Sequence, residues 1–282
     1  MIQHHTQVIV KGNAFTYIFS KKNGMFEQID FAGHKYLDVP MELNIWRAPT
    51  DNDMYAKLEW KKAHYDQSYV RAYTTVVSKG KNFVEIKANA AMSAATIQKI
   101  MDVEITWTID GNGGITSKLN VKKNDEFPDL PRFGVRLFLN NKLENVSYFG
   151  MGPYESYRDK HQATSHGLYR AKVREMHEDY IKPQENGSHF DCDYVELTNG
   201  QFGLAAASEK TFTFNASVYT QEELENAKHN YELVESESTV LCIDYAQNGI
   251  GSNSCGPVVM DEYRFDDVAF EFQFKLVPFV RG

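Results

Sequence analysis

The chain has 282 residues, of which 42% are hydrophobic and 13% aromatic, and its formal net charge is −8. An acidic chain with interspersed charges is a poor candidate for binding nucleic-acid phosphates, and no apolar run approaches the ~20 residues of a membrane span. Aromatic residues are enriched in strands, and all-β domains run long as single units. We therefore expect one soluble β-rich domain over residues 1–282, without a nucleic-acid or membrane partner.

The N-terminus and the cysteines suggest the compartment. Residues 1–5 show no basic segment followed by an apolar one, so no secretory signal is visible. Cys192, Cys242 and Cys255 are odd in number and widely spaced, which fits neither a disulfide framework nor a metal knuckle. We expect a reducing, cytoplasmic setting.

Alternation of apolar and polar residues dominates the chain and predicts strands with one buried face. Glycine and asparagine at 110–114 predict a hairpin turn between two of these strands. Many short strands of this kind are typical of a large antiparallel sandwich. The clearest segments are 15–19, 103–109, 115–121, 133–139 and 268–276.

Helical patterns are scarce. Residues 54–67 predict a short helix with Asp51 or Asp53 as its N-cap. The residues from Thr220 to Glu223 form a capping-box pattern, which predicts a two-turn helix that ends near Lys228.

The first segment with specific chemistry is 44–53, which includes Arg47 and the sequence Asp51-Asn52-Asp53. An arginine offers five donors that carboxylates accept, so a buried hydrogen-bonded corner is our preferred interpretation. The acids could instead hold a hard cation. The further ligands and the glycine of a calcium loop are absent, so we expect no metal site here.

The second segment, 150–160, places Glu155, Tyr157 and Asp159 on a tight glycine-bearing path. These polar groups are candidates for a structural role or for binding a sugar.

The third segment, 180–189, could present Gln184, Glu185, Asn186 and His189 to sugar hydroxyls. A turn with capping side chains explains the same residues equally well.

The fourth segment, 248–257, is rich in small residues, which allow a ligand or another chain to approach closely. It lacks the basic residue and the following helix of a phosphate-binding loop.

Together the four segments, in this order and spacing, resemble the C-terminal domain of β-galactosidases of glycoside hydrolase family two. Two-chain versions carry this domain as a separate small subunit. The resemblance runs from about Val10 to Phe274. It implies a large antiparallel supersandwich related to galactose mutarotase, within an enzyme that hydrolyses terminal β-D-galactosides such as lactose.

The resemblance also implies a place beside the active site, since the family domain packs on the catalytic barrel and lends it a loop. That loop would contain Asn253, Ser254, Cys255 and Gly256 at the substrate rim. The best-studied members have a stacking tryptophan where this chain has Cys255, and a cysteine offers no aromatic platform.

Catalysis in the family uses two carboxylates about 5 Å apart, which belong to the barrel. Their motifs are absent from this chain, and the active-site metal ions are likewise expected on the barrel. We therefore expect no catalytic residue and no cofactor here, an inactive isolated chain, and a catalytic barrel domain or large subunit as its partner.

Three other functions are compatible with such a domain. It could be an autonomous carbohydrate-binding module of mutarotase-like fold, using loops around Tyr157, His161 and His189. A mutarotase-like epimerase would use a glutamate and a histidine as base and acid. A purely structural role in oligomerisation is the third.

Overall fold

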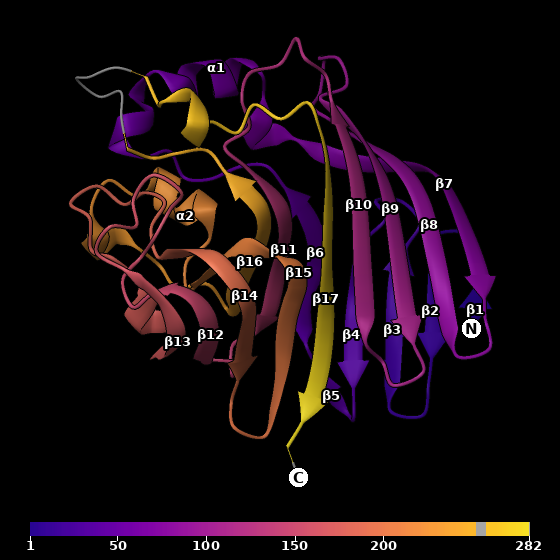
Figure 1. The fold of residues 1–282 in the computed structure, drawn as a ribbon. Coiled ribbons are helices and arrows are strands. Elements are labelled where there is room, and N and C mark those ends of the chain that lie inside the picture. The colour runs from indigo at the N-terminus through magenta and orange to yellow at the C-terminus, as the bar shows by residue number, and fades with distance from the viewer. Residues whose placement is uncertain (252–257, 282) are drawn as a thin grey trace.

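A computed structural model describes residues 1–251 and 258–281 of the chain. Most of these residues are in strands, which form two sheets (Figure 1). In the described part of the chain, no helix is long and apolar enough to cross a membrane.

The larger sheet runs in the order β13-β12-β14-β15-β17-β10-β9-β8-β7, and its branch β16-β11-β6 lies behind it (Figure 1). The smaller sheet runs β1-β2-β3-β4-β5 and also lies behind the front strands. All pairings are antiparallel, so the predicted all-β sandwich is confirmed. The strands are β1 (Ile2–Gln3), β2 (Gln7–Lys11), β3 (Phe15–Ser20), β4 (Phe26–Phe31), β5 (His34–Lys35), β6 (Leu37–Asn44), β7 (Tyr69–Lys79), β8 (Phe83–Ser93), β9 (Met101–Asp110), β10 (Ile115–Lys123), β11 (Arg132–Asn140), β12 (Asn145–Gly152), β13 (Ser165–Lys172), β14 (Ser188–Thr198), β15 (Phe202–Ser217), β16 (Ser238–Gln247) and β17 (Ala269–Val280).

The predicted hairpin is confirmed between β9 and β10. Ile105 lies opposite Leu119, and Gly113 adopts a φ of 91° in the turn, which a glycine tolerates without strain. The hydroxyl of Tyr17 donates to the carbonyl oxygen of Gly113 at 2.6 Å, so the turn is fastened to the smaller sheet.

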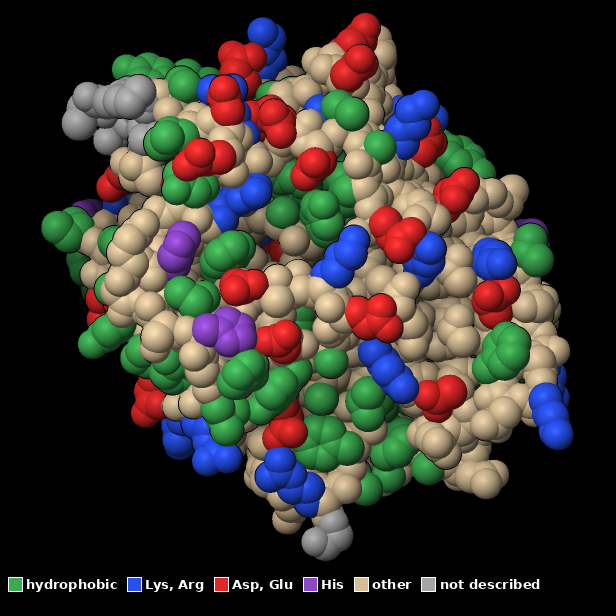
Figure 2. Space-filling view, in the orientation of Figure 1, with side chains coloured by type: hydrophobic (Ala, Val, Ile, Leu, Met, Phe, Trp, Pro, Cys, Tyr) green, Lys and Arg blue, Asp and Glu red, His purple; other side chains and the backbone are tan. Residues whose placement is uncertain are grey.

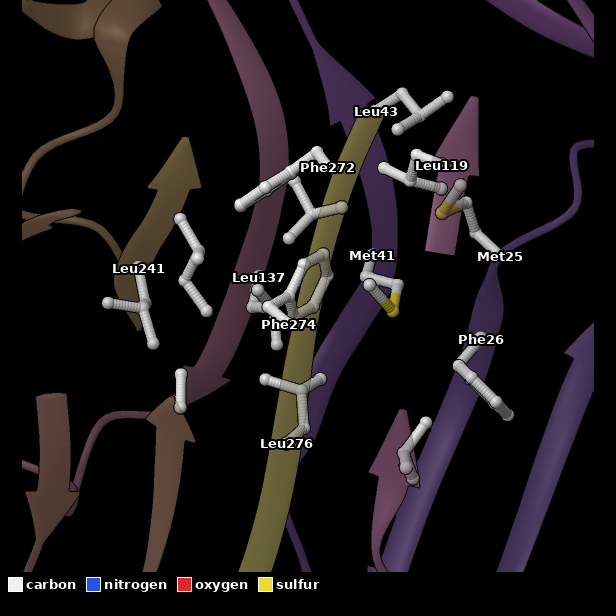
Figure 3. Close-up of a cluster of buried hydrophobic side chains, with 14 of the residues drawn as sticks. Met25, Phe26, Met41, Leu43, Leu119, Leu137, Leu241, Phe272, Phe274 and Leu276 are labelled. Atoms are coloured by element: carbon white, nitrogen blue, oxygen red, sulfur yellow. The ribbon is translucent and has the colours of Figure 1, made fainter. Parts of the chain in front are cut away.

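The core fills the space between the layers (Figure 3). Trp107 is fully buried, and its ring meets Phe26 and Phe274 edge to face at 5.1 and 6.0 Å. Each such side chain stabilises the fold by about 1.5–3 kcal/mol through burial alone. The labelled core residues are Met25, Phe26, Met41, Leu43, Leu119, Leu137, Leu241, Phe272, Phe274 and Leu276.

Two strands depart from the expected single polar face. β11 and β16 are buried along nearly their whole length, because they lie between the front sheet and other elements. Polar residues on them, such as Arg132 and Asp244, are therefore enclosed and must find partners inside the protein.

The prediction of one helix over 54–67 is wrong in its length and in its N-cap. The segment forms a 3₁₀ turn (Asp51–Met54), α1 (Ala56–Lys62) and a second 3₁₀ turn (Tyr65–Gln67). His64 has a left-handed φ of 55°, which ends the α-helical run. The N-cap is Thr50, because its hydroxyl accepts from the amide of Asp53, so neither Asp51 nor Asp53 fills that position.

The second predicted helix is shorter than expected. Thr220 caps α2 (Gln221–Asn226), which ends before Lys228 because Ala227 is extended. The amides of Lys228 and His229 instead donate to the carboxylate of Glu232. The remaining 3₁₀ turns are Val173–Met176, Asn230–Glu232 and Asp261–Tyr263.

Candidate functional site

The four sequence segments meet at one end of the sandwich, where α1 and the ends of several strands gather (Figure 1). Each segment contacts at least one other through a hydrogen bond, although they lie far apart in the sequence. The site is therefore built by tertiary contacts and not by a local motif.

Arg47 is at the centre of the first segment and is fully buried. Its guanidinium makes a two-point contact with Asp53, with Nη2 at 2.7 Å from Oδ1 and Nε at 3.2 Å from Oδ2. The guanidinium also lies over the ring of Trp60, 5.3 Å from its centroid. These contacts hold the arginine in one orientation.

The remaining donors of Arg47 reach the fourth segment. Nη1 donates to the carbonyl oxygen of Asn248 at 2.6 Å, and Nη2 donates to that of Gly249 at 3.2 Å. The side-chain amide of Asn52 donates to the carbonyl oxygen of Ile250 at 2.8 Å. Two side chains of the first segment thus hold three successive carbonyl groups.

The second segment holds the amide groups of the same stretch. Asp159 accepts from the backbone N–H of Ile250 at 3.1 Å and from that of Gly251 at 2.7 Å. Charge-assisted hydrogen bonds of this kind are stronger than neutral ones. The backbone of residues 248–251 is therefore held on two sides. Side-chain donors bind the carbonyl oxygens of residues 248–250, and the carboxylate of Asp159 binds the amides of Ile250 and Gly251.

Residues 248–251 are the stem of the segment that contains Asn253, Ser254, Cys255 and Gly256. These four residues lie outside the described part of the chain, so their predicted place at a substrate rim stays a prediction.

The third segment is tied to the first. The side-chain oxygen of Gln184 accepts from the amide of Asp51 at 2.7 Å, and the amide of Glu185 donates to the carbonyl oxygen of Ala48 at 3.0 Å. Asn186 accepts from the amide of Glu178 at 3.0 Å and donates to the carbonyl oxygen of Gln184 at 2.8 Å.

Glu155 joins the second and third segments. Its carboxylate accepts from the amide of Gly187 at 2.8 Å and also from Lys160 Nζ and Tyr180 Oη. Gly187 has a φ of 68°, and a Cβ there would lie 2.3 Å from the carbonyl oxygen of Met176, so only glycine fits. The carboxylate is therefore fully used in holding the two segments together.

His189 is buried and neutral. Its Nδ1 lies 3.1 Å from the carbonyl oxygen of Met151, which can only accept, so Nδ1 carries the proton. Burial lowers the pKa of His189 to about 4. With Gln184, Glu185 and Asn186 also buried, these side chains serve the internal structure, which favours the capping interpretation of this segment over a surface that displays them to sugars.

Sequence reasoning missed a buried charge cluster beside these segments, the Arg132 cluster of Arg132, Glu185 and Asp244. Arg132 donates to Asp244 Oδ2 at 2.5 Å and to Glu185 Oε2 at 3.2 Å, and all three side chains are enclosed. Burial raises the pKa of Asp244, against the opposing charge of Arg132. The available signal was Asp244, a charged residue directly after the apolar run of residues 240–243.

Asp53 of the first segment is not available to a metal ion. Both carboxylate oxygens of Asp53 are engaged by Arg47, and Oδ2 also accepts from the amide of Thr50 at 2.9 Å. A carboxylate in that position is already neutralised and has little left to offer a cation.

Comparison with known proteins decides the family. Residues 11–276 match the family model described as "Beta galactosidase small chain". This chain belongs to the β-galactosidase small-chain family. The expected family resemblance is thereby confirmed over nearly its whole length.

Relatives of this small-chain domain are much longer proteins. A β-galactosidase of Actinobacillus pleuropneumoniae is 41% identical over 98% of this chain, which spans 27% of the relative. One of Staphylococcus xylosus is 35% identical over 94% of the chain, again across 27% of the relative. The small-chain domain thus corresponds to about a quarter of the length of these enzymes.

Solved structures identify the fold of the small-chain domain. A galactose 1-epimerase from Lactobacillus acidophilus NCFM aligns over 98% of this chain and 95% of its own, with a TM-score of 0.55 at 6% identity. A galactose mutarotase-like protein from Lactobacillus casei gives a TM-score of 0.50 at 9% identity, over 98% of this chain and 100% of its own. The predicted mutarotase-like fold is confirmed, and the low identity limits the likeness to the fold.

Proposed function

We propose that this chain is the C-terminal domain, or the separate small subunit, of a β-galactosidase that hydrolyses terminal β-D-galactosides such as lactose. The observation that carries the proposal is the family match over residues 11–276 in a chain that spans only 27% of its relatives. The other three quarters of such an enzyme would supply the catalytic barrel, with its pair of carboxylates and any metal ions. Residues 1–282 would act as one domain within that enzyme.

The geometry supports a positioning role for this domain. Arg47, Asn52 and Asp159 hold the backbone of residues 248–251, the stem of the proposed rim segment. Asp53 and Glu155 are each bound to a basic side chain within the domain, where they hold its segments together. A stem held this firmly would let the segment beyond it keep one position beside another domain's active site.

Cys255 gives the proposed rim a specific chemical property. Without an aromatic ring at this position, the enzyme would gain less from stacking on a sugar or an aryl leaving group. In the assembled enzyme, Cys255→Trp would then change the ratio of kcat/KM values for an aryl galactoside and for lactose. An unchanged ratio would count against contact between this segment and the substrate.

We also propose a cytoplasmic location. Cys192 and Cys242 are buried free thiols, which suits a reducing compartment.

A complementation experiment tests the function. The Actinobacillus pleuropneumoniae relative would be produced without the 27% of its length that this chain matches. Neither piece alone should hydrolyse a nitrophenyl galactoside, and mixing them should restore hydrolysis and produce a complex on size-exclusion chromatography. Hydrolysis by this chain alone would contradict the proposal.

A further inference from the structure

The chain contains five pairs in which glycine follows asparagine, at residues 23–24, 112–113, 186–187, 199–200 and 248–249. In such a pair the backbone nitrogen of the glycine can attack the side-chain carbonyl carbon of the asparagine and expel ammonia. Water then opens the cyclic imide at either carbonyl group, which leaves an aspartate or an isoaspartate. Glycine favours this attack because it has no Cβ and a flexible backbone. The folded structure decides which of these pairs can react.

Four of these asparagines have a side-chain oxygen that accepts at least one backbone hydrogen bond. The attack requires the side chain to turn onto the following nitrogen, so these bonds have to break first. Their side chains are therefore held away from the reaction. The donating amides are those of Met25 to Asn23 (3.2 Å), Glu178 to Asn186 (3.0 Å), Gln201 and Phe202 to Asn199 (both 2.9 Å), and Phe265 to Asn248 (2.9 Å).

Asn112 is the exception among the five. It is exposed in the turn between β9 and β10, which lies at the open lower end of the large sheet (Figure 1 and Figure 2). Within residues 1–251 and 258–281, its side chain has no hydrogen-bond or ion-pair partner. The glycine amide is hydrogen-bonded in all five pairs and so does not distinguish them. The carboxamide of Asn112, which nothing in the described structure holds, does distinguish this pair.

Gly113, which supplies the attacking nitrogen, is fastened to the smaller sheet. Its amide donates to the carbonyl oxygen of Asp110 at 3.0 Å, within the turn. Its own carbonyl oxygen accepts from the hydroxyl of Tyr17 at 2.6 Å, and Tyr17 is fully buried. Movement of Gly113 towards the side chain of Asn112 strains or breaks both bonds, so the buried hydroxyl opposes the reaction.

We propose that Asn112 is the site at which the folded chain deamidates, and that the hydrogen bond from Tyr17 to Gly113 slows the reaction. In sum, the side-chain amide and water give a carboxylate and ammonium. An aspartate at 112 keeps the backbone path. An isoaspartate adds a methylene group to the backbone before Gly113 and displaces the carbonyl group that Tyr17 holds. The isoaspartate product should therefore loosen the contact between the turn and the smaller sheet.

The test follows deamidation of the whole 282-residue chain in mildly alkaline buffer, folded and in concentrated guanidinium chloride. Peptide mapping by mass spectrometry gives the rate at each of the five pairs. The five rates should be similar in the denatured chain, because glycine follows in each case. In the folded chain Asn112 should keep the largest share of its denatured rate, at least about twofold above any other pair. Each neutral hydrogen bond that has to open lowers the reactive population about two- to tenfold.

Tyr17→Phe tests the buried hydroxyl. It should accelerate deamidation of Asn112 in the folded chain about two- to tenfold, because one bond that holds Gly113 is lost. The matched control is Tyr65→Phe, which removes a hydroxyl that donates to the carbonyl oxygen of Pro128 at 2.7 Å. Tyr65 is also fully buried, but it follows α1 at the opposite end of the sandwich from this turn (Figure 1), so the rate at Asn112 should stay unchanged.

Two results would overturn the proposal. One is another of the five pairs that keeps a larger share of its denatured rate in the folded chain than Asn112 does. The other is a rate at Asn112 that is no higher in Tyr17→Phe than in Tyr65→Phe. The reaction does not depend on the proposed role in a β-galactosidase, so the two proposals can fail separately.

Discussion

Arg47 Nη1 donates to the carbonyl oxygen of Asn248 at 2.6 Å, across a separation of 201 residues in the chain. The same guanidinium is paired with Asp53, so one buried arginine joins the first and fourth segments. The proposed role of this domain in placing a rim segment depends on contacts of this kind.

Arg47→Ala should lower the free energy of unfolding by about 3–5 kcal/mol, because Asp53 would remain buried without its partner. The free energy of unfolding of Arg47→Lys should fall between those of the unsubstituted chain and Arg47→Ala, since a lysine carries the charge without the planar guanidinium. Urea unfolding of the three chains measures the difference. Arg174→Ala is the control: its pair with Glu235 is exposed, and the loss should be below about 1 kcal/mol.

Asp159→Ala should free the amides that the carboxylate holds. Hydrogen exchange at Ile250 and Gly251 should accelerate about tenfold or more, because each amide loses a hydrogen bond to a charged group. The amide of Gly249 is an internal control, because it donates to the backbone of Tyr263 at 2.8 Å. Unchanged exchange at Ile250 and Gly251 would show that Asp159 does not hold this stem.

Gly150 and Gly167 lie opposite each other in β12 and β13 and should respond differently to substitution. A Cβ on Gly150 would lie 2.2 Å from Cys192 Sγ, and one on Gly167 would lie 3.4 Å or more from its neighbours. Gly150→Ala should therefore destabilise the chain by about 1–3 kcal/mol. Gly167→Ala should be neutral or slightly stabilising, since alanine reduces the entropy of the unfolded chain. Equal stabilities in thermal unfolding would contradict this packing.

His189 should make stability depend on pH. Its pKa is about 4 in the folded protein and 6.5 as a reference, so the unfolded chain binds the extra proton between these values. The contribution of the neutral His189 to the free energy of unfolding is complete above the reference pKa and is lost as pH falls towards 4. The free energy of unfolding should decrease by about 2 kcal/mol between about pH 7.5 and 5 from this residue. His189→Gln, which keeps a donor for Met151, should remove this part of the dependence in urea unfolding. A parallel pH profile for the two chains would rule out a neutral buried His189.

Much of the fold could be predicted because alternation is a local signal. Residues 268–276 alternate, and β17 runs there, with Phe272, Phe274 and Leu276 buried. Residues 110–114 contain turn glycines, and the hairpin between β9 and β10 forms there. The helix over 54–67 was predicted too long, because nothing in its pattern shows that His64 takes a left-handed conformation.

Only part of the candidate site could be predicted from the sequence. Arg47 and Asp53 are six residues apart, so their pairing could be expected from the sequence. Asp244 and Glu185 are 112 and 53 residues from Arg132. The pairing of β11 with β16 brings Asp244 to Arg132, and the segment before β14 brings Glu185. Tertiary contacts at such separations leave no periodicity in a single sequence.

The most direct test of the account is a replacement in cis. In the Actinobacillus pleuropneumoniae β-galactosidase, the segment that matches this chain at 41% identity would be exchanged for residues 1–282, and kcat/KM would be measured with a nitrophenyl galactoside. We expect the chimaera to be active within about tenfold of the parent enzyme, a difference of about 1.4 kcal/mol, and deletion of the segment to abolish activity. A folded, soluble chimaera no more active than the deletion would contradict the claim that this chain completes a β-galactosidase.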